Sequence, residues 1–180
     1  MEFKTIRIEK PSGTNLVLGQ TRSAKTIEDI HDALLRLAAE FAFGIAFCEA
    51  SGQRLVRCAG TDEAMIELAR KNAAAVGAGD AFFVFFGSVP PPRDVLAAIK
   101  PLPEVCGIYC ATANPLEVVL ATTDQGCGIV SVIDGFGPKG VESDEDTTWR
   151  EDYLRHVAGF GKLGVYAPSV NPHQKEPLAH

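Results

Sequence analysis

The stretch GCGIVSVIDGFGPKGVESDEDTTWREDYLRHV, residues 126–157, combines an apolar strand, a glycine-rich turn and an acidic helix start. Its apolar run predicts a buried β-strand over residues 128–134, which Asp134 and the following glycine end. Ser143, with Asp146 three positions later, is typical of a capped helix start. An apolar stripe follows at helical spacing: Trp149, Tyr153, Leu154 and Val157. Strand and helix frame the turn, so we expect any chemistry of this stretch to lie in the turn.

The composition of the whole chain favours one cytoplasmic domain with a small-molecule ligand. A chain of 180 residues with 46% hydrophobic side chains is long enough for one core. Its net charge of -6 does not favour binding to nucleic acid or to an anionic membrane. No apolar run reaches the roughly 20 residues that cross a bilayer, and the start MEFKTIRIEK lacks the pattern of a signal peptide. We expect one domain over residues 1–162 and a weakly ordered tail over residues 163–180.

Hydrophobic periodicity predicts further elements around this stretch. Strands are expected over residues 3–9, 14–19, 43–48, 54–57, 81–86, 105–111 and 116–122. Helices are expected from Thr26 to about Glu40, from Thr61 to about Val76 and from Arg93 to Lys100, the first two capped by their threonines. The first two strands predict an N-terminal hairpin, the last two join residues 128–134 in a meander, and residues 81–86 form a central strand. The pattern predicts an α/β fold of the α+β type, with one mixed sheet and four helices.

Several common signatures of catalysis or metal binding are missing from the sequence. The five cysteines are odd in number and none forms C-x-x-C, which argues against a disulfide framework and a zinc site. The chain has no P-loop, and no Ser-His-Asp arrangement can be proposed for it.

The glycines of the turn at 135, 137 and 140 spell G-x-G-x-x-G, a pattern found in dinucleotide sites. Pro138 removes a backbone donor, no strand follows the helix, and the acids of residues 142–146 place negative charge where a pyrophosphate would lie. These features argue against a dinucleotide site.

The acidic residues after the turn have two interpretations. Glu142 precedes the predicted cap, so its carboxylate is a candidate ligand for a divalent cation, while Lys139 and Arg150 balance phosphate charge. Alternatively, the neighbouring acids only stabilise the positive end of the helix dipole, which is the better interpretation for Asp144 and Glu145.

Residues 49–52, with the sequence EASG, form a polar tip directly after the apolar strand 43–48. Loops of this kind often carry binding residues. The alternative is an ordinary turn between two strands, in which Glu49 is solvated.

Four motifs together give the chain a resemblance to a known family. They are DGFGPKGVE at 134–142, WRxxYLR at 149–155, FCEASG at 47–52 and ATANP at 111–115. With them the chain resembles the adenosine-specific kinases over roughly residues 3 to 162. The resemblance implies a compact α/β fold, a homo-oligomer and an adenosine site.

The site implied by the resemblance draws on three segments of the chain. They are Phe47, Glu49, Ser51 and Gly52; Thr112, Asn114 and Pro115; and Asp134, Gly135, Val141 and Glu142. Asn114 can form hydrogen bonds with an adenine edge, Glu49 can accept hydrogen bonds from ribose hydroxyls, and Phe47 offers an apolar surface. ATP with Mg²⁺ is the expected phosphoryl donor.

The chain departs from the family at one position. The family reads G-A-G-H where this chain has Gly77-Ala78-Gly79-Asp80, so Asp80 replaces a histidine associated with phosphorylation. Asp80, with Glu49 as the second candidate catalytic carboxylate, would act as a general base or carry a phosphoryl group. The alternatives are a non-catalytic nucleoside-binding or sensing protein and an oligomeric scaffold without a ligand.

Overall fold

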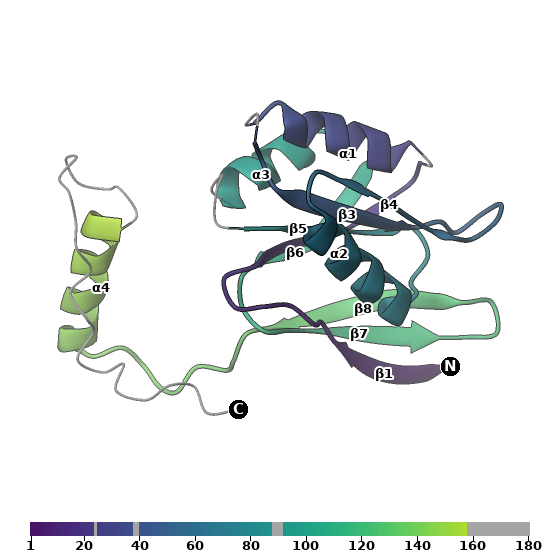
Figure 1. Ribbon diagram of the computed structural model, residues 1–180. Coiled ribbons are helices and arrows are strands. Elements are labelled where there is room, and N and C mark those ends of the chain that lie inside the picture. Colours follow the sequence, from purple (N-terminus) through teal and green to yellow (C-terminus); the bar gives the residue numbers. More distant parts are fainter. Residues whose placement is uncertain (24, 38–39, 88–91, 158–180) are drawn as a thin grey trace. The chain divides into compact units, whose positions relative to one another are not determined.

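The computed structural model describes residues 1–23, 25–37, 40–87 and 92–157 (Figure 1). The chain divides into two compact units, Met1–Phe136 and Gly137–His180, each of which is described by itself. The predicted tail over 163–180 lies outside the described residues, and the single domain over 1–162 stays a prediction.

The first unit contains eight strands and three helices among its described residues. The strands are β1 (Glu2–Arg7), β2 (Asn15–Thr21), β3 (Phe43–Cys48), β4 (Val56–Gly60), β5 (Ala81–Phe86), β6 (Val105–Thr112), β7 (Leu116–Thr122) and β8 (Cys127–Asp134). The helices are α1 (Thr26–Leu35), α2 (Glu63–Val76) and α3 (Pro92–Ile99), and α4 (Asp144–Val157) belongs to the second unit. The predicted α/β class with four helices is confirmed.

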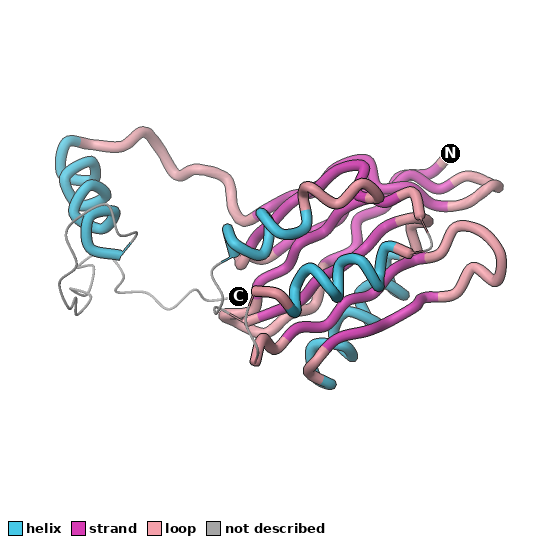
Figure 2. Tube along the Cα trace, turned by 90° about the horizontal axis from the view of Figure 1, so that it is seen from above, coloured by secondary structure: helices cyan, strands magenta, loops and turns pink. Residues whose placement is uncertain are grey.

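The strands form two sheets rather than one mixed sheet. Sheet A has the order β1-β7-β8 and sheet B has the order β4-β3-β5-β2-β6, and every pairing in the described part of the chain is antiparallel. Figure 2 shows that the strands of both sheets have roughly aligned axes. The sequence pattern predicts strands but not their partners, which explains the difference.

The predicted N-terminal hairpin is wrong, because β1 and β2 belong to different sheets. β1 pairs with β7, and the backbone of Ile8 continues this pairing by donating to the oxygen of Leu116 at 2.8 Å. β2 instead lies between β5 and β6. The predicted meander holds only for β7 and β8, since β6 pairs with β2 in sheet B.

Sheet B is covered on both faces. Figure 1 shows α1 and α3 on one face and α2 with sheet A on the other. In β5 the side chains alternate between the two faces of the sheet. Phe82, Val84 and Phe86 pack towards α1 and α3, whereas Phe83 and Phe85 pack towards α2 and sheet A. The predicted central, doubly covered strand is confirmed.

Two predicted helix caps are wrong. Asp62, not Thr61, caps α2, because its carboxylate accepts a hydrogen bond from the backbone nitrogen of Met65 at 2.9 Å. The hydroxyl of Thr61 accepts from the nitrogen of Phe43 instead, at 3.1 Å. Thr26 makes no cap, and α1 ends at Leu35, before the predicted end.

The predicted cap of α4 has the expected geometry. The backbone nitrogen of Asp146 donates to the Ser143 hydroxyl at 3.2 Å, and the backbone nitrogen of Ser143 donates to the Asp146 carboxylate at 3.0 Å. These reciprocal bonds satisfy two donors at the helix start. No helix in the described part of the chain is long and apolar enough to cross a membrane.

Three contacts fix the position of α2. A Cβ added to Gly44 would lie 2.1 Å from the carbonyl carbon of Met65, so β3 and α2 touch through their backbones. Buried Asn72 bonds to the nitrogen and oxygen of Glu9, at 2.8 and 2.7 Å, and so joins α2 to the segment after β1. The thiol of Cys48 donates to the oxygen of Ala73 at 3.5 Å, which holds the C-terminal end of α2 beside the end of β3.

Candidate functional site

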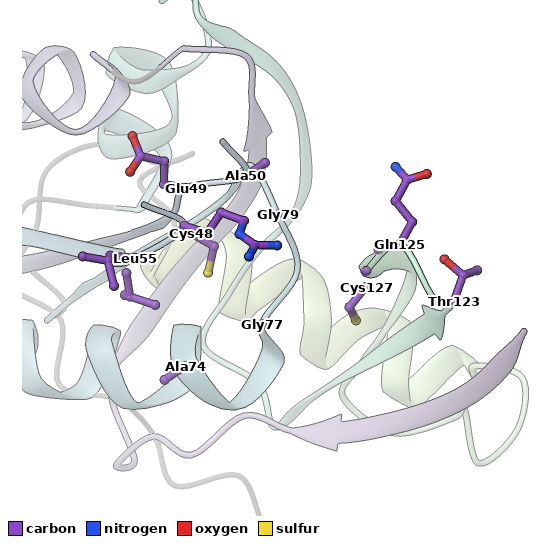
Figure 3. Close-up of a pocket in the computed structure, with 14 residues that line it drawn as sticks. Cys48, Glu49, Ala50, Leu55, Ala74, Gly77, Gly79, Thr123, Gln125 and Cys127 are labelled. Atoms are coloured by element: carbon purple, nitrogen blue, oxygen red, sulfur yellow. The ribbon is translucent and has the colours of Figure 1, made fainter. Parts of the chain in front are cut away.

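The main pocket of the first unit has a volume of about 680 Å³ (Figure 3). Its walls are the β3–β4 loop, the C-terminal end of α2 and the β7–β8 turn. The polar side chains among its described lining residues belong to Cys48, Glu49, Arg54, Thr123, Gln125 and Cys127. Figure 3 shows Glu49 and Ala50 on one side of the pocket, and Thr123 and Gln125 on the other.

Backbone hydrogen bonds build the walls of the pocket. Gly77, in the left-handed conformation with φ 61°, ends α2 by donating to the oxygen of Ala73 at 2.8 Å. The nitrogen of Asp80 then donates to the oxygen of Cys48 at 2.7 Å, which ties the α2–β5 connection to the end of β3. On the opposite wall, Thr123 and Gly126 exchange two backbone bonds of 2.9 and 3.2 Å and close the β7–β8 turn.

Two non-glycine residues at the pocket have a left-handed backbone. Arg54, with φ 53°, and Asp80, with φ 58°, are the non-glycine residues with positive φ in the described ranges. Side chains other than those of asparagine and aspartate rarely adopt this conformation, and such residues cluster at functional sites. Arg54 lines the pocket and Asp80 follows the lining residue Gly79. Arg54 therefore places a strained backbone in the pocket wall, whereas the aspartate at position 80 adopts this conformation at little cost.

A second polar cluster lies where β6, β7 and β8 meet. One carboxylate oxygen of Asp134 accepts from the hydroxyl of Thr112 at 2.6 Å and from the side-chain nitrogen of Asn114 at 3.1 Å. The nitrogen of Gly135 donates to the oxygen of Pro115 at 2.9 Å. The structure thus brings together five of the residues that the resemblance implied. Their hydrogen bonds, however, are made largely with one another.

Lys10 completes this cluster. Its ammonium donates to the backbone oxygens of Ala113 and Thr14, the latter at 3.0 Å. Burial lowers the pKa of Lys10 below its ordinary value, and nearby Asp134 partly offsets this effect. Lys10 was not among the predicted site residues, because its sequence neighbours Glu9 and Pro11 give no sign of the contact.

The pocket and the second cluster lie at opposite ends of the sheets. In sheet B, Phe47 pairs with Phe82 at the end that carries Glu49, whereas Thr112 pairs with Leu16 at the other end. In sheet A, Asp134 pairs with Leu116, and the β7–β8 turn that lines the pocket lies at the far end of the hairpin. Strands of this length separate the two ends by about 20 Å. Within one copy of the chain, Glu49 and Asn114 therefore do not share a pocket.

The sequence profile of the family described as adenosine specific kinase matches residues 6–160. The chain belongs to this adenosine-specific kinase family. The crystal structure of the PH1918 protein from Pyrococcus horikoshii OT3 is similar to it, with 34% sequence identity and a TM-score of 0.82. The similarity covers 91% of this chain and 99% of that one. No curated protein matches the chain.

The family residues at the pocket end differ in their exposure. Glu49 and Asp80 are half-buried, whereas Ser51 and Gly52 are exposed at the tip of the β3–β4 loop. Phe47 is only 1% exposed and packs in the core beside α1 and α3. Its ring therefore has no free face for a ligand.

The remaining family residues lie in the second unit. Both carboxylate oxygens of Glu142 accept from the guanidinium of Arg150, at 2.6 and 3.2 Å, and this bonding lowers the pKa of Glu142. Val141 is 99% exposed and Lys139 is also exposed. Arg150 thus occupies the carboxylate that was the predicted metal ligand.

Two cysteines of the pocket were not predicted as site residues. Burial, with a smaller contribution from Cys58, raises the pKa of Cys48 to about 12, so its thiol stays protonated near neutral pH. The thiol of Cys127 lies 3.8 Å from the oxygen of Val76. Cys48 is therefore a poor nucleophile, and the carboxylates are the better candidates for chemistry in this pocket.

Proposed function

We propose that this member of the adenosine-specific kinase family binds adenosine in the main pocket and phosphorylates it with ATP. The observation that carries the proposal is the position of two carboxylates, Glu49 in the pocket wall and Asp80 next to the lining residue Gly79. The volume of about 680 Å³ falls within the range of roughly 300–1,000 Å³ that is common for small-molecule sites. The family supplies the substrate class.

Each carboxylate has a proposed role. Glu49 accepts hydrogen bonds from ribose hydroxyls and orients the nucleoside. Asp80 takes the proton of the attacking ribose hydroxyl while that oxygen forms a bond to the γ-phosphorus of ATP. The bond between this phosphorus and the bridging oxygen breaks, and ADP leaves with its electron pair. The backbone bond from Asp80 to Cys48 supports this role, because it fixes the base relative to the wall that carries Glu49.

Magnesium does not fit a site made by the described residues alone. They contain no group of three His, Cys, Asp or Glu side chains that could hold a metal ion, and Glu142 is paired with Arg150. A magnesium ion would arrive with ATP, held by phosphate oxygens and water.

A homo-oligomer is part of the proposal. The outward face of sheet A exposes three large apolar side chains, Phe3 at 60%, Val130 at 55% and Ile133 at 50%. Exposed apolar surface of this kind favours association. The family resemblance and the composition together favour a cytoplasmic, self-associating protein.

A non-catalytic nucleoside-binding or sensing protein is the second candidate function. It is favoured by the absence of a P-loop from the sequence and by Asp80 in place of the histidine that the resemblance implies. The two candidates share the adenosine pocket and differ only in turnover.

Calorimetric titration separates these functions. We expect adenosine to bind the purified protein more tightly than guanosine, and ATP with Mg²⁺ added to the adenosine complex to give continuing heat from turnover. Adenosine binding without turnover would support the sensing protein. Absence of adenosine binding would contradict both functions.

A further inference from the structure

Arg54 is the basic residue among the described residues that line the main pocket. Glu49 is the acidic one in the same set. Within the described part of the chain, the structure gives the guanidinium of Arg54 no hydrogen bond or ion pair. By contrast, Arg57 on the adjoining strand is paired with Glu28. Arg54 therefore brings an unengaged positive charge to a pocket in a chain of net charge -6.

The loop holds Arg54 in a conformation that arginine rarely adopts. Its φ is 53°, in the left-handed region where glycine carries no steric penalty. The nitrogen of Arg54 donates to the oxygen of Ser51 at 3.1 Å, and the nitrogen of Glu49 donates to the oxygen of Leu55 at 3.2 Å. These bonds close the loop on both sides of Arg54. An arginine in this strained conformation suggests that its side chain has a functional role.

A guanidinium is well suited to bind the phosphate group that the proposed reaction transfers. It presents several N–H donors in one plane and binds phosphate oxygens through paired, charge-assisted hydrogen bonds. We propose that Arg54 binds the phosphate of an adenine nucleotide in this pocket. The pocket then distinguishes a nucleotide from the bare nucleoside. This inference rests on the proposed adenosine function, since it names the residue of that site that meets the phosphate.

The test compares adenosine and adenosine 5′-monophosphate as ligands of the full chain. Arg54→Gly removes the guanidinium and suits the left-handed backbone, so the fold is retained. We expect Arg54→Gly to weaken binding of the monophosphate about tenfold or more and to change adenosine binding less than about twofold. Arg54→Lys should keep part of the preference, because its ammonium retains the charge but not the paired geometry.

Gln53→Gly is the matched control, because Gln53 is exposed in the same loop and does not line the pocket. It should leave both affinities unchanged. An unchanged ratio of the two affinities in Arg54→Gly would overturn the role of Arg54 while leaving the adenosine function intact. Failure of the unmodified protein to bind adenosine would overturn the proposed function itself. Equal weakening by Gln53→Gly would assign the effect to loop flexibility and would also overturn the role of Arg54.

Discussion

Gly44→Ala is expected to lower the free energy of unfolding by about 3 kcal/mol or more, near or beyond the upper end of the usual cost of overpacking. The added Cβ would lie 2.1 Å from the carbonyl carbon of Met65 and 2.2 Å from the nitrogen of Ile66. Both atoms belong to the backbone of α2, so no side-chain rotation relieves the clash. The helix must move away from β3, and the pocket wall at its C-terminal end moves with it. Urea unfolding followed by circular dichroism measures the change.

Gly128→Ala is the control for this prediction. Gly128 also lies in a strand, but a Cβ there would meet no atom within 4 Å. We expect its free energy of unfolding to stay within about 0.5 kcal/mol of the unmodified protein. Equal stability of Gly44→Ala and Gly128→Ala would contradict the close contact between α2 and β3.

Asp80→Asn is expected to reduce phosphorylation of adenosine about 100-fold or more, the usual contribution of a general base. Asparagine has nearly the shape of aspartate and tolerates the left-handed backbone, so the φ of 58° and the bond to Cys48 should persist. Only the proton acceptor is lost. Adenosine affinity, measured by calorimetry, should therefore remain nearly unchanged while turnover, measured by release of ADP, falls.

Asp124→Asn provides the control for the change of charge. Asp124 is exposed in the β7–β8 turn, in the wall of the pocket opposite the wall that carries Glu49. Its replacement should leave turnover unaffected. Full turnover in Asp80→Asn would exclude Asp80 as the base, and a parallel loss of adenosine affinity would instead assign Asp80 to binding.

The sequence predicts the elements of this fold better than their partners. The run Ala81–Phe86 is apolar at every position, and such a strand must be covered on both faces, as β5 is. Nothing local distinguishes a hairpin between β1 and β2 from their placement in separate sheets. The pairing of β1 with β7, which the backbone bond from Ile8 to Leu116 continues, decides between them, and it joins residues far apart in the sequence.

For the candidate site, too, the sequence predicts individual residues better than which of them lie together. The family motifs name Glu49, Asn114 and Asp134, but they do not reveal that the register of the sheets separates Glu49 from the other two. Arg54 carries no sequence signal at all. Its relevance depends on a positive φ and on a pocket that forms only when α2 and the β7–β8 turn meet the β3–β4 loop.

Substitutions in the main pocket and in the second cluster show where adenosine binds. Ala74 and Ala75 are exposed neighbours on α2, but only Ala74 lines the pocket. Calorimetry with adenosine would compare Ala74→Phe, Ala75→Phe and Asn114→Ala. We predict that Ala74→Phe abolishes measurable binding, because its ring fills the pocket, whereas Ala75→Phe and Asn114→Ala bind normally. Normal binding by Ala74→Phe together with loss of binding in Asn114→Ala would place adenosine at the second cluster and contradict its proposed binding in the main pocket.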